Sequence, residues 1–283
     1  MINAPATRSD SMDEELEEWS DRIEAKAAST RFDPTRVRVF SRCDSTQDPA
    51  RDLGIGSVVT ASRQSAGRGR LGRAWVEDQE TGIAVSFGLE AIPPDQACIA
   101  VAVACVKAVR GVLLERGASP EQVGRVGLKF PNDLVDRRGG RKIGGILVEV
   151  SGDLAVVGIG LNLHPRRWPV GIEGISVADL APGLNLARIE FLERLLVEVD
   201  RAWSLPAEQL DAYFAAEHAP TGGRVDIGIG DDSDPSARVT GRLRDLEPRR
   251  RLVVDGDRGP IEVPVDRARI LSWTPHDLRS PTT

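Results

Sequence analysis

The sequence predicts an α+β fold in which helices cover a mostly antiparallel sheet. Short β segments follow one another from residue 125, connected by turns such as Pro131-Asn132-Asp133 and Arg138-Gly139-Gly140. Connections this short require antiparallel neighbours, because a parallel crossover needs about a dozen residues or more. Segments with helical spacing flank this series. Beyond Gly222, strand-like pieces recur about every ten residues without a helical signal, which predicts a small C-terminal β-barrel.

The N-terminal part is expected to mix helices and strands. A capping-box pattern at Ser11–Glu14 predicts a helix that runs to about Ser29, because apolar side chains follow it at helical spacing. Asp95 is expected to cap a second long helix that continues to about Glu115. Between these helices, strands are expected at Val37–Phe40, Val58–Ala61 and Ile83–Leu89. A short helical piece is expected at Ala50–Leu53, between the first two strands.

The rest of the chain divides at about Pro220–Gly223. Before this boundary the expected strands are Arg125–Phe130, Leu134–Asp136, Lys142–Val150 and Leu154–Leu163, and the expected helices are Leu186–Trp203 and Glu208–Glu217. After it the expected strands are Arg224–Ile229, Ala237–Leu246, Arg250–Val254 and Ile261–Val265. The predicted organisation is a disordered tail at 1–10, a main domain at 11–220, a small β-barrel domain at 221–274 and a tail at 275–283.

Composition and charge argue against several classes of protein. The 283 residues include 37 Lys and Arg against 43 Asp and Glu, so the formal net charge is −6 and nonspecific binding to DNA or anionic lipid is not expected. The longest apolar run, Ala97–Val106, is shorter than the roughly 18 residues that span a bilayer. The N-terminus lacks a secretory signal, and the three cysteines and three histidines show no metal-ligand spacing. These features favour a reduced, cytoplasmic protein.

The most unusual stretch is Ser62–Trp75, with the sequence SRQSAGRGRLGRAW. Its four arginines repel one another and destabilise a loop unless an anion binds, and its glycines let backbone N–H groups turn toward a phosphate. We therefore expect an anion site, with a solvated basic loop as the simpler alternative. Gly67, Gly69 and Gly72 also fit G-x-G-x-x-G. No helical signal follows them to face a pyrophosphate, which argues against a dinucleotide-binding oxidoreductase.

Two further constellations place polar residues on strands or turns. Lys142 begins an apolar strand after a Gly-rich turn, and Lys129 precedes the Pro131-Asn132-Asp133 turn. Burying a lysine costs on the order of several kcal/mol unless an anion compensates it, whereas a solvated lysine at a strand end needs no ligand. The segment Gly158–Asn162 interrupts an apolar strand with two glycines and an amide. That pattern indicates either the close approach of another group or a β-bulge.

Five motifs together resemble those of the biotin protein ligases. They are DST at Asp44–Thr46, Q-x-AGRGR-x-GR-x-W at Gln64–Trp75, K-F-PND at Lys129–Asp133, RK-x-x-GILVE at Arg141–Glu149 and G-x-G-x-N at Gly158–Asn162. The resemblance implies a biotin/lipoate ligase-like catalytic domain followed by a small SH3-like domain. It also implies a reaction in which biotin and MgATP form biotinoyl-5′-adenylate and pyrophosphate. The adenylate then acylates one lysine of a biotin carboxyl carrier protein, the partner of the enzyme.

The resemblance also implies which residues form the site. The biotin-binding residues would be Ser45, Thr46, Gln47, Gln64, Gly67, Arg68, Gly69, Arg70, Lys142 and Gly144. The nucleotide would be held by Arg68, Arg70, Arg73, Trp75, Lys129, Asn132 and Asn162, with adenine on Trp75 and its base edge at Asn162. The catalytic set would be Lys142, Arg70, Lys129 and Asp133, where the cations neutralise the reacting anions and the carboxylate meets the carrier lysine. No protein-held metal is expected, because Mg²⁺ enters with ATP.

Several alternatives stay open beside this interpretation. A lipoate–protein ligase-like enzyme is the nearest one, and a non-catalytic biotin sensor is another. Gln47, Phe130 and Leu71 depart from the usual asparagine, tryptophan and polar residue of the family. Some members carry an N-terminal winged helix and repress transcription. The few, acidic residues before Val37 do not suit that module, so DNA binding is not expected. No membrane contact is expected, and a homodimer is left open.

Overall fold

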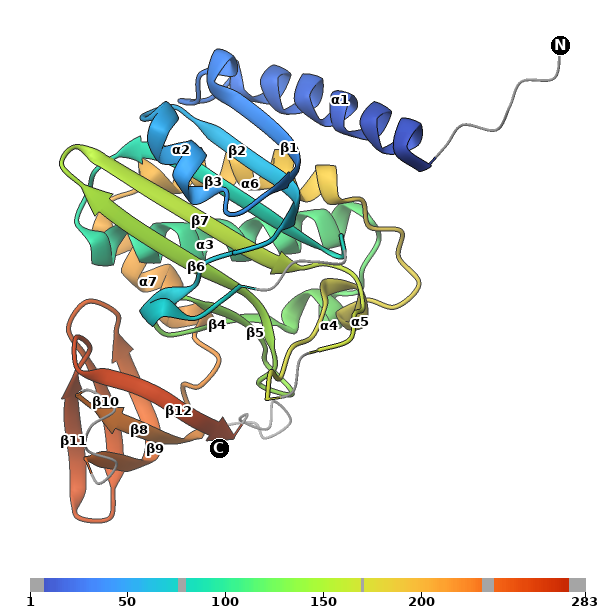
Figure 1. Cartoon of the computed structure of the whole chain (residues 1–283). Coiled ribbons are helices and arrows are strands. Elements are labelled where there is room, and N and C mark those ends of the chain that lie inside the picture. The colour runs from blue at the N-terminus through green and yellow to red at the C-terminus, as the bar shows by residue number, and fades with distance from the viewer. Residues whose placement is uncertain (1–7, 76–79, 169–170, 231–236, 275–283) are drawn as a thin grey trace, which may run out of the picture.

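A computed structural model of the chain contains two β-sheets joined by a short linker (Figure 1). The structure describes residues 8–75, 80–168, 171–230 and 237–274. The helices are α1 (Arg8–Ala27), η1 (Pro34–Arg36), α2 (Gln47–Leu53), η2 (Arg70–Gly72), α3 (Pro94–Glu115), α4 (Pro120–Gly124), α5 (Val177–Leu180), α6 (Arg188–Trp203) and α7 (Ala207–Glu217). The strands are β1 (Val37–Cys43), β2 (Val58–Gln64), β3 (Gly82–Glu90), β4 (Val126–Lys129), β5 (Asp133–Asp136), β6 (Lys142–Ser151), β7 (Leu154–Asn162), β8 (Arg224–Ile229), β9 (Arg238–Glu247), β10 (Arg251–Gly256), β11 (Gly259–Pro264) and β12 (Ala268–Thr274).

The larger sheet has seven strands in the order β1-β2-β3-β7-β6-β5-β4. Its neighbouring strands are antiparallel except for β1 and β2, which are parallel. The chain between β1 and β2 contains α2, which forms the crossover that a parallel pair requires. The prediction of an α+β fold with a mostly antiparallel sheet covered by helices is therefore confirmed.

Helices cover the two faces of this sheet unequally (Figure 1). On one face α3 packs against β6, and α6 packs against both α3 and β3. By length and composition α3 could cross a membrane, but 72% of its most apolar window is buried inside the protein, so it is a core helix here. On the opposite face α2 packs against β3 and β7, beside the loop that follows β2. A site can therefore form between α2, this loop and the sheet.

Several predicted boundaries are wrong. Helix α1 begins at Arg8, so the predicted tail at 1–10 is too long and Ser11 lies inside the helix rather than at its cap. Residues 1–7 and 275–283 lie outside the described residues. The N-cap of α3 is Pro93, because two prolines open the helix, and Asp95 stands in the first turn, where a carboxylate favours the helix dipole. The sequence periodicity also fails to predict strand β12 and helices α4 and α5. These two helices are only five and four residues long.

The C-terminal domain is a small all-β unit, as the spacing predicts, built from one antiparallel sheet of five strands that is not closed into a complete barrel. Its strand order is β11-β10-β9-β8-β12, and within the described part of the chain the two outer strands do not pair with each other. Arg249 joins this sheet to α7 through an ion pair with Asp211 at 2.8 Å. The Trp273 ring lies 3.5 Å from the place where a Cβ on Gly140 would be. The small domain therefore rests on the turn that immediately precedes Lys142.

Two neighbouring leucines of α3 provide a test of the core. Leu113 is fully buried, whereas Leu114 is 57% exposed. We expect Leu113→Ala to lower the free energy of unfolding by about 2–5 kcal/mol, because it leaves a cavity in the core. Leu114→Ala, the matched control, should change it by less than about 0.5 kcal/mol. Urea unfolding followed by circular dichroism measures both, and equal losses would contradict this packing.

Candidate active site

Glycines on the central strand β7 let side chains from other parts of the chain lie close to the sheet. A Cβ on Gly160 would lie 2.2 Å from Cε2 of Trp75, and one on Gly158 would lie 3.0 Å from Oε1 of Gln47. Strand β7 pairs with β3 in unbroken register over its whole length, so these glycines form no bulge. Of the two interpretations of the Gly158–Asn162 motif, the close approach of another group is therefore confirmed.

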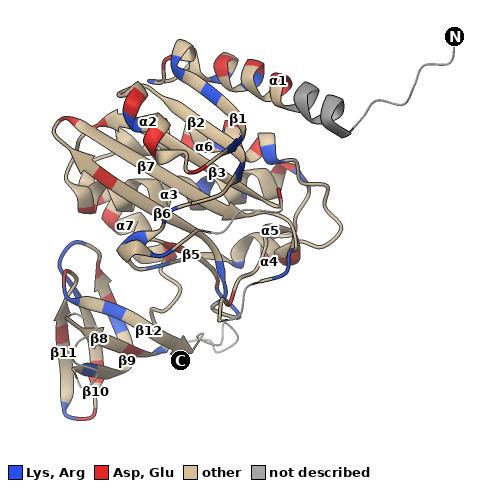
Figure 2. Ribbon diagram, viewed as in Figure 1, with Lys and Arg blue, Asp and Glu red and all other residues tan. Residues whose placement is uncertain are grey.

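The arginine- and glycine-rich loop folds back on itself to deliver Trp75 to the sheet. The N–H of Gly69 donates to the carbonyl of Arg73 at 2.7 Å, and the N–H of Trp75 donates to the carbonyl of Gly67 at 2.7 Å. A Cβ on Gly67 would lie 2.3 Å from the Trp75 carbonyl, so this return requires glycine. The loop carries Arg68, Arg70 and Arg73, whereas most of the length of β3 and β7 is uncharged and tan in Figure 2. The loop thus presents cations above an uncharged sheet surface.

A pocket lies between this loop, the N-terminus of α2 and strands β3, β6 and β7. Its open volume is about 60 Å³. The predicted site residues that line it are Ser45, Thr46, Gln47, Gln64, Arg68, Gly69, Arg70, Trp75, Asn132 and Lys142. The structure adds Ala84, Ser86, Gly145, Ile146, Leu147, Gly158, Ile159 and Gly160. Segments that are far apart in the sequence therefore converge on one pocket.

One wall of the pocket is a buried hydrogen-bond cluster around Thr46. Its N–H donates to Oε1 of Gln64 at 2.9 Å, and its hydroxyl lies 2.7 Å from the hydroxyl of Ser86. Ser45 lies beside it and is also buried. Because these groups bond to one another, their side chains are held in place before a ligand binds.

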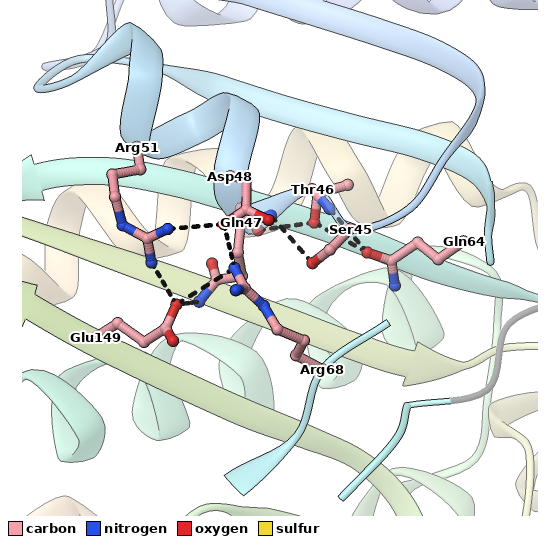
Figure 3. Close-up of polar contacts among 9 residues, drawn as sticks. Ser45, Thr46, Gln47, Asp48, Arg51, Gln64, Arg68 and Glu149 are labelled. Atoms are coloured by element: carbon pink, nitrogen blue, oxygen red, sulfur yellow. Dashed lines mark hydrogen bonds and ion pairs between the residues drawn. The ribbon is translucent and has the colours of Figure 1, made fainter. Parts of the chain in front are cut away.

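A second polar cluster holds the loop arginine Arg68 at the pocket wall (Figure 3). Its Nη2 lies 2.7 Å from Oδ1 of Asp48 and 3.6 Å from Oε2 of Glu149. Arg51 of α2 contacts the same two carboxylates, each at 2.7 Å. Gln47 donates from Nε2 to Oε2 of Glu149 at 3.1 Å. Two carboxylates thus balance two guanidinium groups, which offsets the charge repulsion in the loop.

Lys142 stands at the start of β6 with its ammonium group at the pocket. Its Nζ lies 2.6 Å from Oδ1 of Asp133 and 5.8 Å from the centre of the Trp75 ring. Its backbone N–H donates to Glu173, and its carbonyl accepts from Nδ2 of the buried Asn162 at 3.1 Å. The backbone of Lys142 is therefore fixed, while 37% of its side chain remains exposed.

The other predicted site residues lie around the pocket rather than in its lining. Lys129 is opposite Asp133 in the pairing of β4 with β5. Burial lowers the pKa of Lys129, Asp133 opposes this, and Lys142 and Arg73 lower it further. Gly144 is needed for strand packing, because a Cβ there would lie 2.6 Å from Leu161. Asn162 donates a hydrogen bond to the backbone carbonyl of Lys142, as described above.

A second hollow in the molecule is less suited to chemistry. A hollow of about 700 Å³ lies between α1, α3 and α6, but its arginines pair with glutamates in the same wall, as Arg22 does with Glu193 at 2.8 Å. Among the residues that the structure describes, no three His, Cys, Asp or Glu side chains are grouped so that they could hold a metal ion. The motif-lined pocket is therefore the candidate site.

Sequence reasoning missed the acidic partners of the loop. Glu149 lies in the GILVE motif, and alternation along β6 places it on the same face as Gly145 and Leu147, which line the pocket. That signal could have included Glu149 among the site residues. Nothing comparable marks Asp48 or Ser86, because each meets its partner only through the fold.

Comparison with known proteins identifies the class. Residues 35–163 match the biotin/lipoate A/B protein ligase family. A biotin–[acetyl-CoA-carboxylase] ligase of Mycobacterium tuberculosis is 33% identical over 71% of this chain and 73% of its own length, and one from Paracoccus denitrificans is 34% identical over 62% and 74%. The bifunctional ligase/repressor BirA of Escherichia coli is 31% identical, and the match spans 58% of its length. The chain therefore belongs to the biotin/lipoate A/B protein ligase family.

Within this family, the chain groups with the biotin protein ligases. Its fold agrees with that placement. The biotin protein ligase of Aquifex aeolicus, solved in complex with biotin and ATP, superposes with a TM-score of 0.69 over 85% of this chain and 99% of that protein, at 23% identity. The ligase of Leishmania major in complex with biotinyl-5-AMP gives a TM-score of 0.57 at 20% identity.

The contact between Trp75 and β7 can be tested at Gly160. We expect Gly160→Ala to push the indole off the strand, since the new Cβ would overlap the ring. The fluorescence of Trp75 is obtained as the difference between each protein and its Trp75→Phe derivative. Acrylamide should quench this fluorescence more strongly in Gly160→Ala than in the wild type. Gly124→Ala is the matched control, because a Cβ there meets nothing within 4 Å. Unchanged quenching in Gly160→Ala would contradict the packing.

Proposed function

We propose that this protein is a biotin–[acetyl-CoA-carboxylase] ligase that works through the pocket beneath the arginine loop. It joins biotin to the α-phosphate of ATP, and it transfers the biotinoyl group to a lysine of a biotin carboxyl carrier protein. The observation that carries the proposal is the pocket itself. Preset polar groups at Thr46 and Gln64 form one wall, and the cations of Lys142, Arg68 and Arg70 form another. A ligand with a polar ring and an anionic tail suits both.

The first half-reaction brings two anions together. An oxygen of the biotin carboxylate attacks the α-phosphorus, an O–P bond forms, and pyrophosphate leaves with the electrons of the broken P–O bond. Catalysis therefore rests on charge neutralisation and positioning. Lys142, whose ammonium group stands at the pocket, is suited to contact both the carboxylate and the phosphate oxygens. Arg70 adds positive charge from the pocket lining, and Lys129 of β4, whose ammonium group feels the nearby charge of Arg73, adds more beside it. Mg²⁺ would enter as part of the MgATP substrate.

The loop must shift to admit these ligands. An open volume of about 60 Å³ is well below the roughly 300 Å³ of small-molecule sites. Arg70 donates to Oδ1 of Asn132 at 3.0 Å, and Asn132 in turn donates to the carbonyl of Ile146 at 2.8 Å. Releasing this contact would free Arg70 for the phosphates. Trp75 then offers its aromatic face to adenine, and Asn162 its buried oxygen to the base edge.

In the second half-reaction the amine of the carrier lysine attacks the carbonyl carbon of the adenylate. A C–N bond forms, AMP leaves with the electrons of the broken C–O bond, and the amine gives up a proton. Asp133 is suited to accept a hydrogen bond from the incoming lysine, because Lys142 already holds its carboxylate beside the pocket at 2.6 Å. Cytoplasmic location, a homodimer and the lack of DNA binding stay predictions.

A mass measurement tests the proposed function. The purified chain is incubated with MgATP, an apo carrier domain, and either biotin or lipoate. We expect the carrier to gain the mass of one biotinoyl group and to gain nothing from lipoate. A lipoyl increment alone would favour the lipoate-ligase alternative. Biotin binding without any increment, and without ATP–pyrophosphate exchange, would favour the non-catalytic sensor.

The role of Lys142 can be tested separately in the first half-reaction. We expect Lys142→Ala to slow biotin-dependent ATP–pyrophosphate exchange about 10²–10³-fold, because one preset cation at the developing charge is lost. Lys26→Ala is the control, because Lys26 lies on α1 and lines the other hollow of the molecule. This variant should catalyse ATP–pyrophosphate exchange at the wild-type rate. Exchange by Lys142→Ala at the wild-type rate would exclude this role.

A further inference from the structure

Asp48 lies outside the five sequence motifs, in the first turn of α2, and it contacts the arginine- and glycine-rich loop (Figure 3). Its Oδ1 accepts from Nη2 of Arg68 and from Nη1 of Arg51, each at 2.7 Å. Burial raises the pKa of Asp48, but the hydrogen bonds from Arg68 and Arg51 outweigh burial, so the pKa is lowered. The carboxylate is therefore ionised, and it is shared between an arginine of its own helix and an arginine of the loop.

The contact with Asp48 ties the middle of the loop to the rest of the protein. Nη2 of Arg68 also lies 3.6 Å from Oε2 of Glu149, so the loop arginine contacts both α2 and β6. At the base of the loop, the N–H of Ser65 donates to the carbonyl of Cys43 at the end of β1. The four arginines of this segment repel one another. Two carboxylates at its middle oppose that repulsion and favour the closed position of the loop.

The contact with Asp48 leaves part of the Arg68 guanidinium for the pocket. Nε of Arg68 is buried and has no hydrogen-bond partner among the described residues, and Arg68 lines the pocket. A guanidinium group is planar, so its N–H groups are fixed relative to one another. Holding Nη2 at Asp48 therefore also fixes the position of Nε. An anionic ligand can then meet Nε while Arg68 stays bound to the carboxylate.

We propose that Asp48 is a positioning residue that acts through Arg68: its carboxylate holds the loop closed over the pocket, both in the empty protein and while the adenylate is bound. The second half of this inference rests on the proposed function and deepens it. The loop has to open for a ligand to enter or leave, because the open volume is only about 60 Å³. Weakening the contact raises the population of the open loop, and the adenylate then escapes faster.

Hydrogen exchange of the loop in the empty full chain, followed by mass spectrometry, tests the first half. The N–H groups of Gly69 and Trp75 donate to carbonyls within the loop, and a return this short is marginal without the sheet beneath it. We expect Asp48→Asn to speed their exchange about two- to fivefold, the effect of one exposed ion pair. Asp48→Glu, which keeps the charge, should recover most of the protection. Asp255→Asn is the matched control, because it removes a comparably exposed ion pair with Arg244 in the small domain.

Arg51 separates anchoring of the loop from a role of Asp48 in α2 alone. Arg51→Met removes the other partner of Asp48, and the carboxylate then pairs with Arg68 only. Loop exchange in Arg51→Met should therefore be no faster than in the wild type. Salt gives a second readout, because it screens exposed ion pairs. Sodium chloride at about 1 M should speed loop exchange in the wild type more than in Asp48→Asn.

Release of the adenylate tests the second half. Each protein is loaded with biotin and MgATP, separated from free nucleotide by rapid gel filtration, and followed as it loses biotinoyl-adenylate. Asp48→Asn should release the adenylate about two- to fivefold faster than the wild type. The single-turnover rate of adenylate formation should stay within about twofold, because Asp48 does not touch the reacting atoms. Release at the wild-type rate would overturn this half of the inference.

The outcomes separate this inference from the proposed function. Loop exchange in Asp48→Asn at the wild-type rate would overturn the inference. An equal acceleration in Arg51→Met would also overturn it, because Asp48 would then act on the fold of α2. If circular dichroism shows that Asp48→Asn is unfolded, Arg68→Met takes its place, and unchanged loop exchange in that variant would count against the proposal. The exchange measurement uses the empty chain, so a wild-type chain that forms no biotinoyl-adenylate would overturn the proposed function and leave the anchoring of the loop by Asp48 intact.

Discussion

The close approach of two side chains to bare strand positions is the constraint on which the site depends. Trp75 and Gln47 lie directly on β7 because Gly160 and Gly158 have no side chains to displace them. A methyl group at Gly160 would overlap the Trp75 indole, and one at Gly158 would crowd the Gln47 carboxamide at 3.0 Å. Every other feature of the pocket follows from this contact, because the loop carries Arg68 and Arg70 and α2 carries the residues that face them.

Charge balance explains how an arginine-rich loop can fold against such a surface. The guanidinium of Arg68 is held by Asp48 and Glu149, and Arg51 shares the same carboxylates. These pairs are more than a third exposed, so each stabilises the fold only modestly, and their main effect is on geometry. Arg70, by contrast, contacts the neutral amide of Asn132. The loop thus separates an arginine that anchors it from one that stays available to an anion.

The sequence predicts the parts of this site better than their assembly. The Gly158–Asn162 motif indicates that some group approaches β7, but Gln47 and Trp75 are distant in the chain and only the fold brings them there. The antiparallel order of β4 to β7 follows from short turns, which are local. The start of α1 and the open edge of the C-terminal sheet depend on competing caps and on pairing between distant strands. The local sequence pattern does not determine either of these two features.

Lys142 shows how the same fold fixes a backbone and leaves a side-chain ammonium group adjustable. Its backbone N–H and carbonyl are hydrogen-bonded to Glu173, Ile175 and Asn162. The turn before it packs against Trp273 of the small domain. Its ammonium group, on a flexible four-carbon chain, meets Asp133 from this fixed origin. A carboxylate or phosphate that enters the pocket can therefore compete with Asp133 for the same cation without any movement of β6. Positioning catalysis needs this combination, because the reacting anions must be drawn together within a frame that does not move.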